Sequence, residues 1–259
     1  MLVGREQDFR QRSIAIAPDT SPLIHLDAVD LSIDGLDILR GISVRTGARR
    51  IAVLGRNGSG KTTLARVMAG LSKPTGGAVR IAGVEVPRDR RGALAAVGIL
   101  FQNPDHQIIF PTVGEELAFG LTQMGLDKAE VKARVTQTLA RFGKGAWLDV
   151  AVHQLSQGQR QLVCLMAILA MDPKVIILDE PFAGLDIPTA MHLVRVLDGT
   201  EAALVHITHD PRMVAGYDHA LWIEGGRIEM QGSAAEVAPA FEAAMRELGA
   251  RDDLTDLTG

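Results

Sequence analysis

The sequence predicts an α/β fold built on a largely parallel sheet. Short apolar runs at residues 51–54, 97–101, 175–178 and 203–207 are typical of strands that are covered on both faces. Helix-like periodicity follows most of these runs, which is the pattern of parallel βαβ units. The chain has 259 residues, of which 47% are hydrophobic and 22% charged, so it can bury a sizeable core.

The first part of the chain predicts an antiparallel sheet. Residues 1–22 are expected to be a flexible leader that ends in the helix-breaking sequence Pro-Asp-Thr-Ser-Pro at residues 18–22. Two alternating segments, residues 26–33 and 38–44, flank an Asp-Gly turn and predict a hairpin. A second strand pair is expected at residues 77–81 and 84–86, turning at an Ala-Gly pair. This antiparallel part precedes and follows the first apolar run.

Helices are predicted wherever apolar residues recur at helical spacing. Residues 112–142 show this periodicity, with Asp127 as a candidate N-cap, and another helix begins at Ser156. The remaining predicted elements are a helix at 187–197, a hairpin of strands 220–223 and 227–230, an Ala-rich helix at 234–248, and a polar end.

Composition excludes several function classes. The net charge of −4 argues against binding nucleic acid through bulk electrostatics. The single cysteine, Cys164, lies in an apolar stretch, so we expect a core residue and no intrachain disulfide. Apolar runs are far shorter than the ~20 residues that span a bilayer, and the first residues lack a signal-peptide core. The cytoplasm is therefore the expected compartment.

Residues Gly55–Thr62 read Gly-Arg-Asn-Gly-Ser-Gly-Lys-Thr and follow the apolar run 51–54 directly. Glycines at a strand-to-helix turn let backbone N–H groups surround a phosphate at the helix N-terminus. Lys61 would reach the terminal phosphates, and Thr62 would ligate Mg²⁺. The residues expected to bind the nucleotide are Gly55, Arg56, Asn57, Gly58, Ser59, Gly60, Lys61, Thr62 and Thr63.

Further candidate residues stand at the ends of the other apolar runs. Asp179 and Glu180 end the run 175–178, so Asp179 would hold the metal opposite Thr62, while Glu180 would polarise the attacking water. Gln102 and His209 each follow a predicted strand and can approach the γ-phosphate from there. The carboxyl ends of parallel strands share one edge of the sheet, where ligands bind.

A second anion-binding motif opens the helix at residues 155–161, Leu-Ser-Gln-Gly-Gln-Arg-Gln. Ser156 is a good N-cap, and Gly158 would let a phosphate approach the backbone N–H groups. One phosphate group needs only one cradle, so this motif and the loop at 55–62 would not serve the same nucleotide in one chain. A second copy of the chain would use both.

Together these motifs resemble the nucleotide-binding subunit of ATP-binding-cassette (ABC) transporters over roughly residues 23–234. The matches are Walker A at 55–62, the Q-loop at Gln102, the signature at 155–159, Walker B at 175–179 with the catalytic Glu180, the D-loop at 183–186, and the switch His209. The resemblance implies a P-loop NTPase with a RecA-like core, an antiparallel β subdomain, a helical subdomain at about 104–170, and a C-terminal helix and tail at 235–259.

The same resemblance implies an ATPase that binds ATP and Mg²⁺ and works as a head-to-tail dimer. Thr62, Gln102 and Asp179 would hold the metal, and Glu180, His209 and Gln102 would be the catalytic residues. Each ATP would lie between Walker A of one chain and the signature of the other. The residues that reach the partner's ATP would be Ser156, Gln157, Gly158, Gln159 and Asp186.

The sequence departs from the family pattern at three places. The signature has Gln157 where glycine is usual, and residues 46–50 lack the customary Gly-Glu pair before Walker A. The position that usually stacks an aromatic ring on adenine falls at Ile33. Adenine would then rest on an aliphatic surface and lose stacking energy of about 1 kcal/mol.

The segment from Phe101 to Gly120 resembles the ATPases of energy-coupling-factor transporters, which import vitamins and transition-metal ions. In that group, the transmembrane T component docks after the Q-loop, here near Asp105–Thr112, and the substrate-binding S component is contacted indirectly. Ile108, Ile109 and Phe110 form an apolar cluster suited to an amphipathic helix. The alternative is a loop that packs them inward.

Residues 33–41 and 49–55 look closest to the ATPases of biotin transporters, with those of cobalt and nickel transporters as the nearest alternative. The expected function is ATP hydrolysis that powers biotin uptake, by a homodimer at the cytoplasmic face of the cell membrane. Two other classes stay open, a soluble ABC ATPase without a transport role and a nucleotide sensor that does not hydrolyse ATP. The intact Glu180 and His209 weigh against the sensor.

Overall fold

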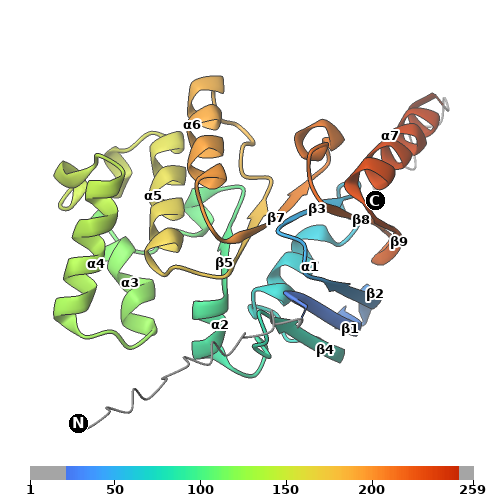
Figure 1. Ribbon diagram of the computed structural model, residues 1–259, viewed down its shortest axis with the longest axis horizontal. Coiled ribbons are helices and arrows are strands. Elements are labelled where there is room, and N and C mark those ends of the chain that lie inside the picture. Colours follow the sequence, from blue (N-terminus) through green and yellow to red (C-terminus); the bar gives the residue numbers. More distant parts are fainter. Residues whose placement is uncertain (1–21, 251–259) are drawn as a thin grey trace, which may run out of the picture.

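A computed structural model of the chain contains two sheets, with a group of helices at one end of the molecule (Figure 1). The structure describes residues 22–250. The predicted leader at 1–22 and the polar end after residue 250 therefore fall outside the described residues, apart from Pro22.

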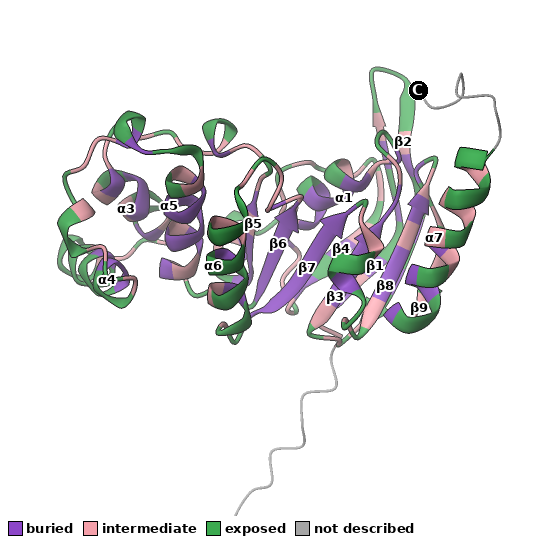
Figure 2. Ribbon diagram, turned by 90° about the horizontal axis from the view of Figure 1, so that it is seen from above, coloured by how far each residue is buried: buried purple, intermediate pink, exposed green. Residues whose placement is uncertain are grey.

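The larger sheet has six strands in the order β5-β6-β7-β3-β8-β9, and all neighbours pair in parallel except β8 and β9. The central strands are buried along almost their whole length (Figure 2) because helices and the second sheet cover them. The strands are β3 (Arg50–Leu54), β5 (Val97–Leu100), β6 (Val175–Asp179), β7 (Ala203–Thr208), β8 (His219–Glu224) and β9 (Arg227–Gly232).

The smaller sheet is antiparallel and has the order β2-β1-β4. Its strands are β1 (Ile24–Ile33), β2 (Leu36–Thr46) and β4 (Gly76–Ile81). The hairpin expected between β1 and β2 is confirmed, and its turn places Asp34 and Gly35 in the left-handed region, where these residue types are tolerated. Alternate residues of these strands pack under the larger sheet in one apolar cluster with α1 (Lys61–Met68).

Three longer helices form the end of the molecule opposite the C-terminal helix (Figure 1). α3 (Val113–Gln123), α4 (Lys128–Arg141) and α5 (Gln157–Ala170) share an apolar cluster with β5 and β6. The C-terminal helix α7 (Ala234–Ala250) packs on β3 and β8 in a separate cluster. The other helices are α2 (Arg90–Ala96), α6 (Ile187–Asp198) and short 3-10 turns at Pro104–His106, Gly145–Trp147, Val152–Gln154 and Pro211–Val214.

Some predicted elements differ from the structure. Residues 84–86 do not form a strand, since Val84 makes only an isolated bridge to Ile81 across a tight turn. The helical stretch at 112–142 is two helices, because the chain turns at Gly125, which has a φ of 85°. The second of them begins at Lys128, and the side chain of Asp127 caps it as predicted. Helix α2 was not predicted, since seven residues give too short a pattern.

Within residues 22–250, no helix is both long enough and apolar enough to cross a membrane. Cys164 is buried in the helical cluster, as expected for a core residue.

Candidate functional site

The glycine-rich loop joins β3 to α1 and leaves the start of that helix open. Gly60, the residue before α1, has a left-handed φ of 104°, and no side chain caps the first amides of the helix. Gly55 must be glycine because a Cβ there would lie 2.4 Å from the Ile223 carbonyl oxygen. Uncapped N–H groups at a helix N-terminus form a site for an anion.

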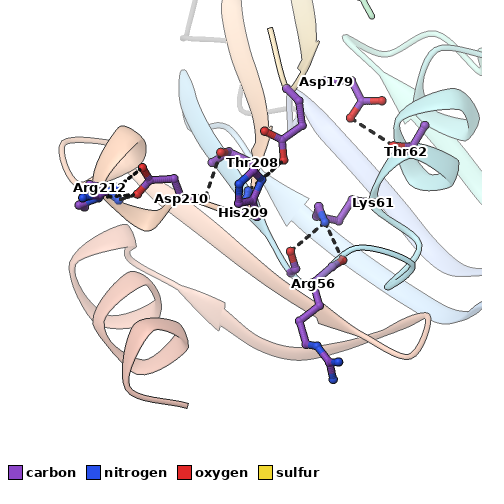
Figure 3. Close-up of polar contacts among 10 residues, drawn as sticks. Arg56, Lys61, Thr62, Asp179, Thr208, His209, Asp210 and Arg212 are labelled. Carbon is purple, nitrogen blue, oxygen red and sulfur yellow. Dashed lines mark hydrogen bonds and ion pairs between the residues drawn. The ribbon is translucent and has the colours of Figure 1, made fainter. Parts of the chain in front are cut away.

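Lys61 is buried at this helix start, with 7% of its surface exposed. Its Nζ donates hydrogen bonds to the carbonyl oxygens of Gly55 (2.8 Å) and Arg56 (2.7 Å), as Figure 3 shows. Burial lowers the pKa of Lys61, and this effect outweighs the nearby carboxylates of Glu180 and Asp179, which raise it. Burial has removed the hydration that would stabilise this ammonium. A bound anion would replace that lost stabilisation.

A cavity of about 510 Å³ lies over this loop, at the carboxyl ends of β3, β6 and β7. It is the place that strand order predicts, since the ends of parallel strands meet there. The residues that line it are Ile38, Asn57, Gly58, Gly60, Lys61, Thr62, Thr63, Gln102, Asp179, Glu180 and His209. The structure thus brings the predicted Gln102, Asp179, Glu180 and His209 to the loop from three other parts of the chain.

Thr62 and Asp179 could hold a divalent cation in this cavity. The Thr62 hydroxyl donates a hydrogen bond to Asp179 Oδ1 (3.2 Å), and Asp179 is only 5% exposed. Burial raises the pKa of Asp179, although the bond from Thr62 lowers it. A buried carboxylate beside a hydroxyl, with Gln102 on the same cavity, fits the oxygen ligands that Mg²⁺ prefers. A cation there would offset the cost of burying the charge.

Glu180 and His209 are joined in a direct contact. His209 Nδ1 lies 2.7 Å from Glu180 Oε1, and the backbone N–H of His209 donates to the same oxygen (3.0 Å). Glu180 has a φ of 48°, a strained conformation for this residue type that aims its side chain toward His209 and the cavity. The Glu180 carboxylate therefore lines the cavity in contact with His209, and a carboxylate in such a place can act as a proton acceptor.

The turn after His209 is fixed by its own side chains. Asp210 forms an ion pair with Arg212 (2.8 Å), and its N–H donates to Thr208 Oγ1 (3.1 Å), as Figure 3 shows. The bond from Arg212 lowers the pKa of Asp210. The His209 side chain is largely exposed, and both its ring and its backbone N–H contact Glu180.

The second anion motif lies away from this cavity. Ser156 accepts a hydrogen bond from the Gln159 N–H (3.3 Å), and Gln159 Oε1 accepts one from the Ser156 N–H (2.9 Å), so α5 begins with a capping box. Gly158 faces α6, where a Cβ would lie 2.6 Å from Thr189 Cγ2. Neither Ser156, Gln157, Gly158 nor Gln159 lines the cavity.

Five other predicted residues also lie outside the cavity lining: Gly55, Arg56 and Ser59 of the glycine-rich loop, and Asp186 and Ile33. Asp186 caps α6 through the Thr189 N–H (2.8 Å), and its pKa is lowered by hydrogen bonding to the Thr189 side chain and then to the Thr189 backbone. Ile33 stands at the end of β1 with 49% of its surface exposed, whereas Ile38 on β2 lines the cavity instead. Ile38 was missed because the sequence does not show how far β2 reaches over the loop. Its carbonyl oxygen lies 3.2 Å from where a Cβ of Gly60 would stand.

A second hollow of about 580 Å³ lies between the two ends of the molecule, beside the segment that follows Gln102. Ile109 is 69% exposed on its rim, while Ile108 packs against the helical cluster. Glu116 Oε2 accepts hydrogen bonds from the N–H groups of Ile109 and Phe110, both 2.9 Å. The apolar cluster expected at 108–110 is thus split, with one residue turned inward and one outward.

Comparison with known proteins gives a consistent result. The family described as ABC transporter matches residues 41–183. The biotin transport ATP-binding protein BioM of Rhodobacter capsulatus is 50% identical over 225 residues, which cover 87% of this chain and 96% of that protein. The nickel import ATP-binding protein NikO of the same organism is 37% identical, covering 84% of this chain and 91% of that protein.

Among solved structures, the fold matches that of cbiO1 from Clostridium perfringens, described as part of the ABC transporter complex cbiONQ. The TM-score is 0.71 at 30% sequence identity, and the match covers 90% of this chain and 96% of that one. The two sheets and the helical end described above are therefore a known arrangement.

Proposed function

Because this chain belongs to the ABC transporter family of ATP-hydrolysing subunits, we propose that it powers the uptake of biotin through an energy-coupling-factor transporter. The observation that carries the proposal is the identity of 50% to a biotin transport protein, against 37% to a nickel import protein over a similar length. The transported solute is not expected to contact this subunit, so no residue of the site indicates which solute it is. The choice of biotin rests on sequence identity over the whole chain.

In this proposal the cavity at the strand ends binds ATP. Lys61 and the open start of α1 would bind its phosphates, while Thr62, Asp179 and Gln102 would hold Mg²⁺. The bound ion would neutralise charge on the phosphoryl oxygens. Glu180 would take the proton of the attacking water, and His209 would hold the Glu180 side chain in place through the 2.7 Å contact. Ile38 would support the adenine side in place of a stacking ring.

A second copy of the chain would complete each site. The residues Ser156–Gln159 stand outside the cavity, so one chain alone does not bring both anion motifs to the same phosphates. Since one chain carries the complete set of motifs, two identical chains arranged head to tail would form two working sites. We therefore infer a homodimer.

The hollow beside Gln102 is the proposed docking site of the transmembrane T component, near Asp105–Thr112. Exposed apolar residues such as Ile109 and Phe119 line this hollow. Phe101 lines it too, next to Gln102 of the nucleotide cavity. A helix seated there would be coupled to the nucleotide through the loop that contains Gln102, and the S component would be reached through the T component. This docking would place the chain peripherally at the cytoplasmic face of the membrane.

The test is solute uptake by cells that lack their own biotin transporter and express this chain with its candidate membrane partners. Labelled biotin should accumulate, and the variant Lys61→Ala should not support this uptake. Uptake of nickel or cobalt ions without uptake of biotin would favour the metal-ion alternative instead. ATP hydrolysis by the purified chain, without co-purification from membranes, would favour an ABC ATPase with no role in transport.

A further inference from the structure

A buried glutamine on α5 ends the motif at residues 155–161, and no role was predicted for it from the sequence. Gln161 is 1% exposed, although it follows the signature by only two residues. Its Nε2 donates hydrogen bonds to the carbonyl oxygens of Phe101 (2.9 Å) and Pro181 (3.5 Å). Both neighbours are acceptors, which fixes the orientation of the amide with its nitrogen toward them.

These two carbonyls stand beside the two loops of the cavity. Phe101 is the residue before Gln102, and Pro181 is the residue after Glu180. One side chain thus joins the peptide next to the predicted metal and γ-phosphate ligand to the peptide next to the predicted base. Because both bonds come from the same nitrogen, a movement of α5 would shift the two loops together.

Phe101 is held from its other side as well. Its N–H donates to Gln107 Oε1 (3.1 Å), so two glutamine amides fix the backbone of this residue. The Gln161 Oε1 atom is buried without a hydrogen-bond partner among residues 22–250. Leaving a buried acceptor unpaired costs free energy, and such groups in native proteins are typical of sites with a role beyond packing.

We propose that Gln161 is a positioning residue that sets the distance between Gln102 and Glu180 and links both to the start of α5. This rests on the proposed function, in which the start of α5 contacts the nucleotide of the second chain. When that nucleotide pulls on α5, Gln161 carries the displacement to both loops of its own chain. Occupancy of one site would thereby adjust the catalytic residues of the other.

The experiment replaces the amide without changing its size. Gln161→Met removes the donor and keeps the volume, while Gln161→Glu keeps the shape but turns acceptors toward two carbonyls. Each should lower kcat for ATP hydrolysis roughly tenfold or more while the Kd for ATP stays within about twofold, because the phosphate loop is untouched. A matched control is Thr138→Val, which removes another buried hydrogen bond, from Thr138 Oγ1 to the Arg134 carbonyl oxygen (2.8 Å), far from either loop.

The control should lower the melting temperature without changing kcat. A second variant, Gln107→Met, releases Phe101 from its less buried side and should lower kcat in the same way. Its effect should not add fully to that of Gln161→Met, since both act on one residue. Unchanged kcat in Gln161→Met, or equal losses in Gln161→Met and Thr138→Val, would overturn the inference. If the unaltered chain fails to hydrolyse ATP, the proposed function itself is wrong.

Discussion

The two helices that begin at glycine-containing motifs, α1 and α5, start in opposite ways. The first amides of α1 have no side-chain cap and face a cavity with a buried lysine and two carboxylates. The start of α5 is capped by Ser156 and Gln159, whose side chains each accept a hydrogen bond from the other residue's N–H. Similar motifs in the sequence therefore give one open helix start and one that is satisfied by its own side chains.

This difference assigns separate tasks to the two motifs. An open helix start beside Lys61 can bind a phosphate in the isolated chain. A capped start gains less from an anion, since the Gln159 N–H already has an acceptor in the Ser156 hydroxyl. We therefore expect nucleotide affinity to reside in α1, and the contribution of α5 to follow only when a second chain presents its nucleotide.

The largest expected effect is on kcat, from a change at Glu180, the proposed base in the cavity at the open start of α1. Glu180→Gln keeps the size of the side chain but no longer accepts a proton, so kcat should fall roughly 10²- to 10⁴-fold while ATP still binds. Phosphate release and binding of a fluorescent ATP analogue would measure the two effects. The control Glu201→Gln changes an exposed carboxylate near β7 and should leave kcat unchanged. Normal turnover in Glu180→Gln would remove Glu180 from its role.

The next effect is on nucleotide binding. Lys61→Ala removes the buried ammonium and should weaken ATP binding roughly a thousandfold, since two charge-assisted hydrogen bonds to phosphate are lost. Isothermal titration with the nucleotide would measure the change, with the exposed Lys128→Ala as a control. Affinity close to that of the unaltered chain would mean that the open helix start is not the phosphate site.

A buried histidine on β7, a strand that ends at the nucleotide cavity, should determine how stability depends on pH. Burial lowers the pKa of His206 on β7 from 6.5 to about 4, and the residue is 2% exposed. The unfolded chain thus takes up this proton at higher pH than the folded chain. Above pH 6.5 both states are neutral at His206, and the free energy of unfolding is not reduced by this residue. As the pH is lowered to 4, the free energy of unfolding should fall by about 3 kcal/mol.

Urea unfolding at several pH values would measure this loss, with His206→Phe as the test variant. It should flatten the profile between pH 6.5 and 4, even if it is less stable at pH 7. The exposed His192→Phe is the control and should keep the slope of the unaltered chain. Equal slopes in all three proteins would place the acid sensitivity elsewhere.

The smallest expected effect tests the closed side. Ser156→Ala removes the cap of α5 and should cost about 1 kcal/mol of stability. The single chain should still bind ATP as before, but the dimer should hydrolyse it more slowly. Asp127→Ala is the matched control, because it removes the cap of the same kind of capping box on α4. It should cost similar stability without changing turnover, and weaker ATP binding by a monomeric Ser156→Ala chain would break the comparison.

Much of the site could be predicted because its residues belong to short continuous motifs. The run 51–54 and the glycines after it specify a strand, a tight turn and an open helix start within twelve residues. Gln102, Asp179 and His209 could be added because each follows an apolar run, and parallel strands end at one edge. Ile38 and Gln161 could not, since their positions depend on how β2 lies over the loop and how α5 is rotated.

The sequence by itself determined which residues can bind phosphate or metal or accept a proton, because each motif is a short continuous segment of the chain. The tertiary structure decided which of them share a site. It placed Ser156–Gln159 outside the cavity and brought Gln161 into contact with carbonyls that lie 60 and 20 residues away in the chain. The physical reason is that local patterns fix backbone conformation, whereas contacts between distant segments depend on how the helices and sheets pack.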